Sequence, residues 1–168
     1  MRTVPFGIIG AGLMGREFAS AAARWAHLPQ MAVRPEIAVV CDTNPAILAW
    51  YRDHFPSVRK TTGDYREVLA DPGVEAVYCA VPHHLHAALY TDILRAGKHL
   101  LGEKPFGIDA AANAAILAEC ARQPRVLVRC SSEFPFYPAV QRMGGWIEQS
   151  AFGRILEVNS YFLHSSDL

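Results

Sequence analysis

The sequence predicts an α/β fold built on a doubly wound parallel sheet, and three observations support this fold class. Short apolar runs alternate with helical patterns from residue 4 to residue 130. A glycine-rich turn follows the first apolar run and opens the first helix. No internal repeat or low-complexity linker interrupts the alternation. Strands that alternate with helices of this length form βαβ units, whose parallel sheets carry helices on both faces.

The expected elements follow from hydrophobic periodicity and from the residues that begin and end helices. The expected strands cover residues 4–10, 36–41, 58–60 (a short extended piece), 76–80, 98–101 and 126–130, and the expected helices cover residues 13–26, 44–54, 65–70, 84–95 and 110–122. Gly97 stands just after a helix, where glycine is favoured, and Asp109 is a suitable N-cap for the alanine-rich fifth helix.

The alternation stops after residue 130. Residues 138–149 predict a helix, weakened by Gly144 and Gly145, and residues 154–164 predict one long strand. A long strand needs neighbours to satisfy its backbone, and an exposed edge invites aggregation. Either this strand joins the edge of the first sheet or the chain is the front part of a longer protein, and we favour the second. We therefore expect a first domain over residues 1–131, and the start of an incomplete C-terminal α/β domain over residues 132–168.

Composition excludes several classes of protein. Hydrophobic residues make up 51% of the chain and charged residues 19%, which excludes a disordered chain. Sixteen basic residues balance sixteen acidic ones, so we expect neither nucleic acid nor a membrane surface as a partner. No apolar run reaches the length of about 18 residues that a membrane span needs. The N-terminus shows no signal-peptide pattern.

The cysteines point to a reducing compartment. Cys41, Cys79, Cys120 and Cys130 show no metal-binding spacing. Three of them lie in or beside apolar strand runs, where cysteine behaves as a small hydrophobic residue. The pattern favours a reduced, cytoplasmic protein without a zinc site.

The turn Gly10-Ala11-Gly12-Leu13-Met14-Gly15 has the spacing that binds the pyrophosphate of a dinucleotide. Gly10 permits the tight turn, Gly12 lets the backbone approach the phosphates, and Gly15 lets the helix pack closely on the strand. The helix N-terminus offers free N–H groups and the positive end of its dipole. The turn predicts a dinucleotide-binding Rossmann domain over residues 1–131. The alternative is a plain strand-to-helix turn that needs glycines for geometry alone.

Asp42 ends the second expected strand, where a carboxylate can accept hydrogen bonds from the adenosine ribose. It lies 27 residues after Gly15, farther than the usual offset of about 20. A loop over residues 27–35 explains the excess length. A carboxylate here would repel a 2′-phosphate, so we expect NAD, with NADP less favoured. The alternative role is an N-cap for the helix that starts at Asn44, and both roles can hold together.

Two polar clusters follow later strands, at the carboxyl ends where open α/β sheets bind ligands. One is residues 81–86, with His83, His84 and His86, and the other is residues 102–105. His83 and His86 can share a helix face, but His84 cannot join them and no nearby cysteine or aspartate completes a ligand set. We expect no metal here, and assign the histidines to capping or substrate-side contacts.

Lys104 is the residue on this rim best suited to chemistry. It precedes a proline, which restricts its backbone. Such a lysine can hydrogen-bond a substrate hydroxyl or help to take its proton, and general acid–base help is worth roughly 10²–10⁴ in rate. The alternative is a solvated loop lysine paired with Glu103.

Several of these segments together resemble one family. They are the strand at residues 4–9 with its glycine turn, then Cys41-Asp42, Pro82 with His86, and the run Ala96-Gly97-Lys98-His99-Leu100-Leu101-Gly102-Glu103-Lys104-Pro105. The chain resembles the Gfo/Idh/MocA family of oxidoreductases over nearly its whole length, and the last run is the most specific part of the resemblance.

The resemblance implies an N-terminal Rossmann domain and a C-terminal substrate domain. It also implies hydride transfer between a nicotinamide cofactor and a sugar, inositol or related polyol. It places the catalytic Lys104 near the substrate, His86 and Pro82 beside the nicotinamide, and Glu103 where it holds the loop. The residues expected to bind the cofactor are Gly10, Ala11, Gly12, Leu13, Met14, Gly15, Asp42, Ala80, Val81, Pro82, His83, His86, Glu103 and Lys104.

Two departures from the family pattern bear on activity. Gly102 stands where many members have a cysteine. The family's catalytic aspartate and histidine lie farther along than this chain reaches, so His164 and Asp167 are not their equivalents. We expect this chain alone to be inactive and a full-length parent to form a homo-oligomer. Two alternatives are a non-catalytic dinucleotide-sensing or regulatory protein, and a reductase of another Rossmann family in which the run Glu103-Lys104-Pro105 is a coincidence.

Overall fold

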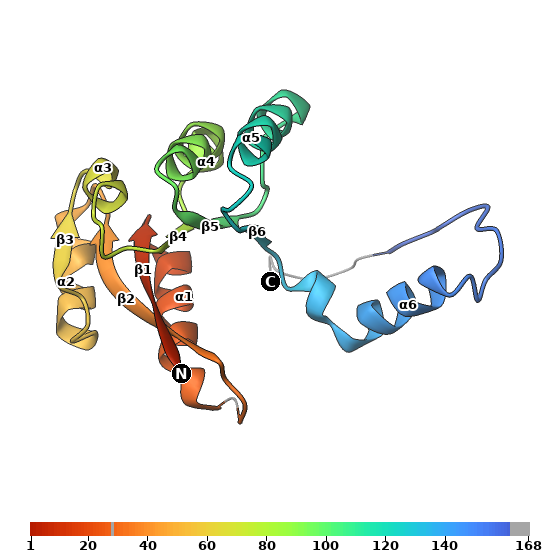
Figure 1. The fold of residues 1–168 in the computed structure, drawn as a ribbon, viewed down its shortest axis with the longest axis horizontal. Helices are drawn as coiled ribbons and strands as arrows, with labels where there is room; N and C mark the ends of the chain where they lie inside the picture. The colour runs from red at the N-terminus through yellow and green to blue at the C-terminus, as the bar shows by residue number, and fades with distance from the viewer. Residues whose placement is uncertain (28, 162–168) are drawn as a thin grey trace, which may run out of the picture. The chain divides into compact units, whose positions relative to one another are not determined.

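Six parallel strands form one sheet within Met1–Ser131 of the computed structural model, which describes residues 1–27 and 29–161 (Figure 1). The strands are β1 (Arg2–Ile9), β2 (Val33–Cys41), β3 (Lys60–Thr62), β4 (Ala76–Cys79), β5 (His99–Glu103) and β6 (Val128–Ser131). Their order across the sheet is β3-β2-β1-β4-β5-β6, and every neighbouring pair is parallel. The chain winds outward from β1 and then restarts at β4, so the β1–β4 boundary is the switch point where such sheets bind ligands. The predicted doubly wound Rossmann sheet is confirmed.

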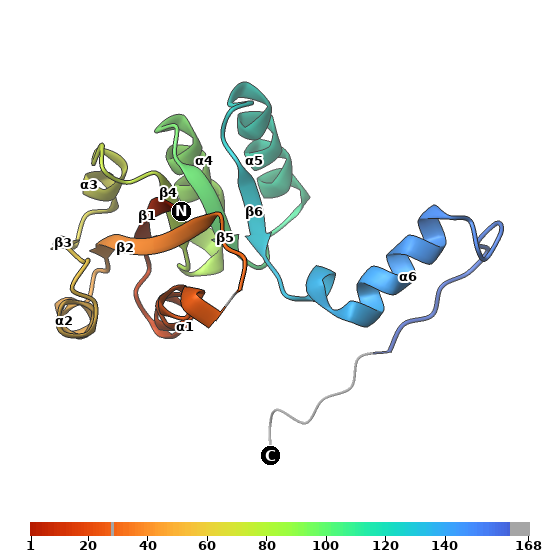
Figure 2. The same ribbon diagram turned by 60° about the horizontal axis from the view of Figure 1, so that its bottom comes forward.

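Helices cover both faces of the sheet, as Figure 2 shows. On one face lie α1 (Leu13–Ala23) and α2 (Pro45–His54), and on the other lie α3 (Tyr65–Leu69), α4 (His86–Arg95) and α5 (Ala110–Arg122). Each face has its own core because successive strand residues point to opposite sides. Ile8 and Val40 belong to the core under α1 and α2, whereas Ile9 and Val39 belong to the core under α3, α4 and α5. No helix among residues 1–27 and 29–161 is long and apolar enough to cross a membrane.

The residues expected to begin and end helices do so. The Asp109 carboxylate accepts a hydrogen bond from the Ala112 N–H at 2.7 Å and caps α5. Gly97 follows α4 with φ +72°, the left-handed conformation that glycine adopts readily. The next residue, Lys98, donates from Nζ to the carbonyl oxygens of Asp71 (2.8 Å) and Val74 (2.7 Å). Part of the Ala96–Pro105 run therefore serves the fold and not a ligand.

Several boundaries differ from the expected ones: the short strand expected at residues 58–60 is β3 at 60–62, the strand expected at 126–130 is β6 at 128–131, and the first helix ends at Ala23 and not at residue 26. Two further differences lie near the site. β2 begins at Val33 because Arg2 of β1 already pairs with it, so residues 33–35 are strand and not loop. The additional residues between Gly15 and Asp42 therefore form the 3₁₀ helix η1 (Trp25–His27) and the first residues of β2. The helix expected from residue 84 begins instead with the 3₁₀ helix η2 (His83–Leu85), and α4 follows from His86.

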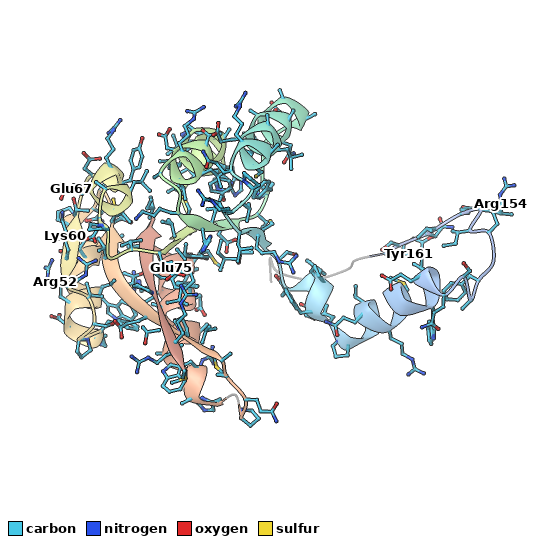
Figure 3. The ribbon with its side chains drawn as sticks, viewed as in Figure 1. Arg52, Lys60, Glu67, Glu75, Arg154 and Tyr161 are labelled. Atoms are coloured by element: carbon cyan, nitrogen blue, oxygen red, sulfur yellow. The ribbon has the colours of Figure 1, made fainter. Side chains whose placement is uncertain are left out.

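A second unit begins at Ser132 and is described by itself. It contains the 3₁₀ helix η3 (Phe134–Phe136) and α6 (Pro138–Glu148). The strand expected from residue 154 is wrong for residues 154–161, which form no strand and are exposed from Arg154 to Tyr161 (Figure 3). An alternating pattern makes a strand only when a neighbour accepts its backbone hydrogen bonds, and among the described residues none pairs with this segment. Residues 162–164 of that expected strand, and Asp167, lie outside the described residues.

Ion pairs tie the short edge strand β3 to its neighbours. Lys60 of β3 lies 2.5 Å from the Glu67 carboxylate of α3 (Figure 3). Just before β3, Arg59 makes a two-point contact with Asp71, with Nη1–Oδ2 at 2.6 Å and Nη2–Oδ1 at 2.7 Å. The hydrogen bond from Arg59 holds the pKa of the Asp71 carboxyl below its usual value.

Asp71→Asn should lower the free energy of unfolding by about 1 kcal/mol near pH 7, a modest effect because Arg59 is half-exposed. The folded pKa of Asp71 lies below the unfolded value of about 3.9. The stabilisation is therefore complete above that value and is lost as the pH falls through the folded pKa. Urea unfolding of the wild type and of Asp71→Asn, from pH 7 down through the pKa of Asp71, checks the role of the Arg59–Asp71 contact. A stability difference that stays constant as the carboxylate titrates would contradict it.

Candidate functional site

A cavity of 530 Å³ opens at the carboxyl ends of the first four strands, beside the β1–β4 switch point. It is lined by Ile9, Gly10, Gly12, Cys41, Asp42, Thr43, Gly63, Tyr65, Ala80, Val81, Pro82, Leu85, Ala88 and Leu89. Its volume lies within the range of small-molecule sites. The pKa of the Cys41 thiol is raised to about 12, mainly because the side chain is buried. Cys41 therefore presents a neutral thiol to the cavity.

The three glycines of the turn have different surroundings. Gly10 has φ +89°, and a Cβ on it would clash with the Ala80 carbonyl oxygen. A Cβ on Gly15 would lie 2.5 Å from the Gly10 carbonyl oxygen and 2.8 Å from the Tyr51 hydroxyl. A Cβ on Gly12 would meet no described atom within 4 Å. The fold therefore requires glycine at positions 10 and 15, whereas at position 12 it leaves open space that borders the cavity.

Asp42 joins the glycine turn to the start of α2. Its Oδ2 accepts from the Ala11 N–H at 2.8 Å, and its Oδ1 accepts from the Asn44 N–H at 2.8 Å. Asn44 itself caps α2 through the Ala46 N–H, so Asp42 is not the N-cap. Each carboxylate oxygen keeps a further lone pair for an incoming hydroxyl group. From the other side, the Tyr51 hydroxyl donates to the Ala11 carbonyl at 3.0 Å.

The structure divides the residues expected to bind the cofactor into three groups. Gly10, Gly12, Asp42, Ala80, Val81 and Pro82 line the cavity. Ala11 and Gly15 are buried behind the turn, whereas Leu13, Met14 and His83 are exposed outside the cavity lining. Glu103, Lys104 and His86 belong to the next part of the rim, described below.

The sequence did not predict several other residues that line the cavity. Gly63 and Tyr65 follow β3, and Leu85, Ala88 and Leu89 come from the η2–α4 segment. Tyr65 donates its hydroxyl to the Asp92 carboxylate at 2.8 Å, and this hydrogen bond raises the pKa of Tyr65. The sequence could have indicated Gly63 and Tyr65 by their position, because residues that follow β3 lie at the same edge of the parallel sheet as Gly10 and Asp42.

The Lys104 loop, Glu103–Pro105, lies at the carboxyl end of β5. Glu103 is 6% exposed, and its Oε1 accepts from the Tyr78 hydroxyl at 2.6 Å. Its Oε2 accepts from the Lys104 backbone N–H at 3.2 Å. The alternative of a solvated loop lysine paired with Glu103 is wrong in its pairing, since this carboxylate hydrogen-bonds only the backbone of Lys104. The Lys104 side chain is exposed, and none of the described residues pairs with its ammonium group.

His86 is fully buried at the start of α4. Its Nδ1 lies 2.7 Å from the Pro105 carbonyl oxygen, and its Nε2 lies 3.0 Å from that of Val81. With both nitrogens engaged by backbone, His86 can affect a ligand only through these two segments. Within residues 1–27 and 29–161, no three histidine, cysteine, aspartate or glutamate side chains gather as a metal site.

Comparison with known proteins gives consistent relatives. A family model described as "Oxidoreductase family, NAD-binding Rossmann fold" matches residues 4–131. Levoglucosan dehydrogenase of Pseudarthrobacter phenanthrenivorans is 30% identical over 165 residues, which cover 97% of this chain and 42% of that protein. Trans-1,2-dihydrobenzene-1,2-diol dehydrogenase of Sus scrofa is 29% identical over 94% of this chain and 45% of that protein. The chain therefore spans less than half the length of these relatives.

Solved structures agree with the sequence relatives. Levoglucosan dehydrogenase in complex with NADH and L-sorbose superposes with a TM-score of 0.82 at 29% identity, over 93% of this chain and 42% of that one. An NAD-binding oxidoreductase from Klebsiella pneumoniae gives a TM-score of 0.79 at 27% identity, over 91% of this chain and 40% of that one. Because the family model matches most of the chain, from residue 4 to residue 131, the chain belongs to the Gfo/Idh/MocA family of oxidoreductases.

Proposed function

We propose that residues 1–131 bind NAD as part of an oxidoreductase that transfers a hydride between this cofactor and a sugar, inositol or related polyol. The observation that carries the proposal is the open space at Gly12, between two glycines that the fold itself requires. A position kept free of a side chain at the mouth of a cavity is where the backbone of such turns approaches a pyrophosphate.

The residues at the cavity fit this cofactor part by part. The N–H groups at the start of α1 would hold the pyrophosphate, because α1 has no side-chain cap among the described residues. Asp42 would accept hydrogen bonds from the hydroxyls of the adenosine ribose. Val81 and Pro82 line the part of the cavity nearest β4 and would lie beside the nicotinamide. The nicotinamide ring, when bound, supplies the carbon that accepts or donates the hydride.

Lys104 is the group we propose to act on the substrate. Its ammonium group is exposed and unpaired among the described residues, so it is free to donate a hydrogen bond to a substrate hydroxyl and to hold or pass its proton. The substrate class rests on the names of the relatives, which include a levoglucosan dehydrogenase and dihydrodiol dehydrogenases. We further propose that the unit beginning at Ser132 is the start of the substrate domain.

Gly12→Val should abolish NAD binding and leave the fold intact. The added side chain enters open space in the free protein but occupies the approach of the pyrophosphate. We expect affinity to fall at least about 100-fold, or about 2.7 kcal/mol, by calorimetric titration.

Gly15→Val is the matched control for this experiment. The same side chain at position 15 would clash with the Gly10 carbonyl, so this variant should lose thermal stability. A Gly12→Val protein that is folded by circular dichroism and binds NAD as the wild type does would contradict the proposed function.

The wild-type chain should bind NAD more tightly than NADP, and Asp42→Ala should narrow this preference about tenfold. The substitution removes a charged acceptor for the ribose hydroxyls and a repulsive charge against a 2′-phosphate. Titration of both cofactors measures the ratio. Asp64→Ala is the control: it also removes a carboxylate after a strand end, the N-cap of α3, and should leave the NAD-to-NADP ratio unchanged. Equal or tighter binding of NADP by the wild type would rule out this role for Asp42.

A further inference from the structure

The Lys104 loop is held by side chains that reach it from both faces of the sheet. Tyr78 of β4 belongs to the core under α1 and α2, and its hydroxyl donates to the Glu103 carboxylate at 2.6 Å. Tyr90 of α4 belongs to the opposite core, and its hydroxyl donates to the Glu103 backbone carbonyl at 2.9 Å. His86 contacts the Pro105 carbonyl at 2.7 Å. The backbone is therefore fixed on either side of Lys104, while the Lys104 side chain stays unpaired among the described residues.

Tyr90 reaches this position because residue 102 is glycine. A Cβ on Gly102 would lie 2.6 Å from Cζ of Tyr90 and 2.8 Å from its hydroxyl oxygen, closer than real contacts allow. The ring thus occupies the space that any other residue at position 102 would fill. It also stacks on His86, with ring centroids 4.8 Å apart and an interplanar angle of 24°. Gly102, Tyr90 and His86 form one packed unit under the Lys104 loop.

His86 connects this unit to the cavity. Its second nitrogen lies 3.0 Å from the carbonyl oxygen of Val81, a cavity-lining residue. Carbonyl oxygens only accept, so a ring nitrogen of His86 that carries a hydrogen is the donor in its contact. One buried ring therefore spans the distance between the wall of the cavity and the loop that carries Lys104.

We propose that Tyr90, seated over Gly102 and stacked on His86, is a positioning residue that holds Lys104 at a fixed place relative to a bound nicotinamide cofactor. This inference rests on the proposed function. Lysine is long and flexible, so its reach is defined only as well as the backbone from which it extends. Misplacing a catalytic group by about 1 Å can cost about 100-fold in rate, so a loop fixed from both faces has a direct use in catalysis. Among the described residues no hydrogen bond joins Tyr90 to Lys104, and the Tyr90 hydroxyl instead donates to the Glu103 carbonyl, so Tyr90 acts through the loop backbone.

Nuclear magnetic resonance of the whole chain, with isotope-labelled lysine, tests this role. The lysines of the sequence are Lys60, Lys98 and Lys104, and the first two already have partners in Glu67 and in backbone carbonyls. They therefore serve as internal references. Hydrogen exchange of the Lys104 amide reports how firmly the loop is held without cofactor, and the shift of the Lys104 side-chain signal on adding NAD reports its place relative to the cofactor.

Tyr90→Phe keeps the stacked ring and removes only the hydroxyl. We expect the Lys104 amide to exchange roughly fivefold to tenfold faster, and the NAD-induced shift of Lys104 to shrink, with unchanged affinity for NAD. Gly102→Ala should give the same result by displacing the ring from the other side. Ile37→Val removes a methyl group from the opposite core and should leave both signals as in the wild type.

The possible outcomes separate this inference from the proposed function. If Tyr90→Phe and Gly102→Ala bind NAD normally and show the wild-type Lys104 exchange and shift, the positioning role is overturned and the proposed function stands. A wild-type chain that binds no NAD would overturn the proposed function and, with it, any role of Tyr90 toward the cofactor. A changed Lys104 signal that appears equally in Ile37→Val would show a general loss of stability and would also overturn the inference.

Discussion

The rim of this sheet depends on how closely α1 approaches the end of β1. The ideal Cβ of Gly15 would lie 2.5 Å from the carbonyl oxygen of Gly10, so helix and turn are in backbone contact. Asp42 and Tyr51 then hold the N–H and the carbonyl of Ala11 from two sides. These bonds form within the protein alone, so the turn is ordered before any ligand arrives. A ligand that binds there spends little of its binding free energy on ordering the site.

The sheet order brings the two halves of the site together. β4 lies between β1 and β5, so the glycine turn and the Lys104 loop stand two strand spacings apart, about 10 Å. Both sit at the carboxyl edge because all six strands in the described residues run the same way. His86 crosses part of this gap by contacting Val81 on one side and Pro105 on the other. The glycine turn and the Lys104 loop are thus joined through contacts along one edge of the sheet.

The sequence predicted the parts of the site that depend on adjacent residues, such as the glycine turn, the Asp42 strand end and the Lys104 loop. It did not predict the parts that depend on distant contacts. Tyr78 and Tyr90 read as core residues in an apolar strand and an amphipathic helix, and nothing local shows that their hydroxyls meet at Glu103. The strand predicted from the apolar pattern at residues 154–161 is wrong for the same reason, because a pattern of side chains does not supply a partner strand.

A crystal structure of the chain with NADH tests the central claim most directly. The account predicts the pyrophosphate within hydrogen-bond distance of the backbone N–H groups beside Gly12, with the adenosine ribose against Asp42 and the nicotinamide on the Val81 side of the cavity. It also predicts that the turn keeps the backbone of the free protein. A cofactor bound elsewhere on the molecule, or one whose phosphates avoid Gly12, would contradict the account.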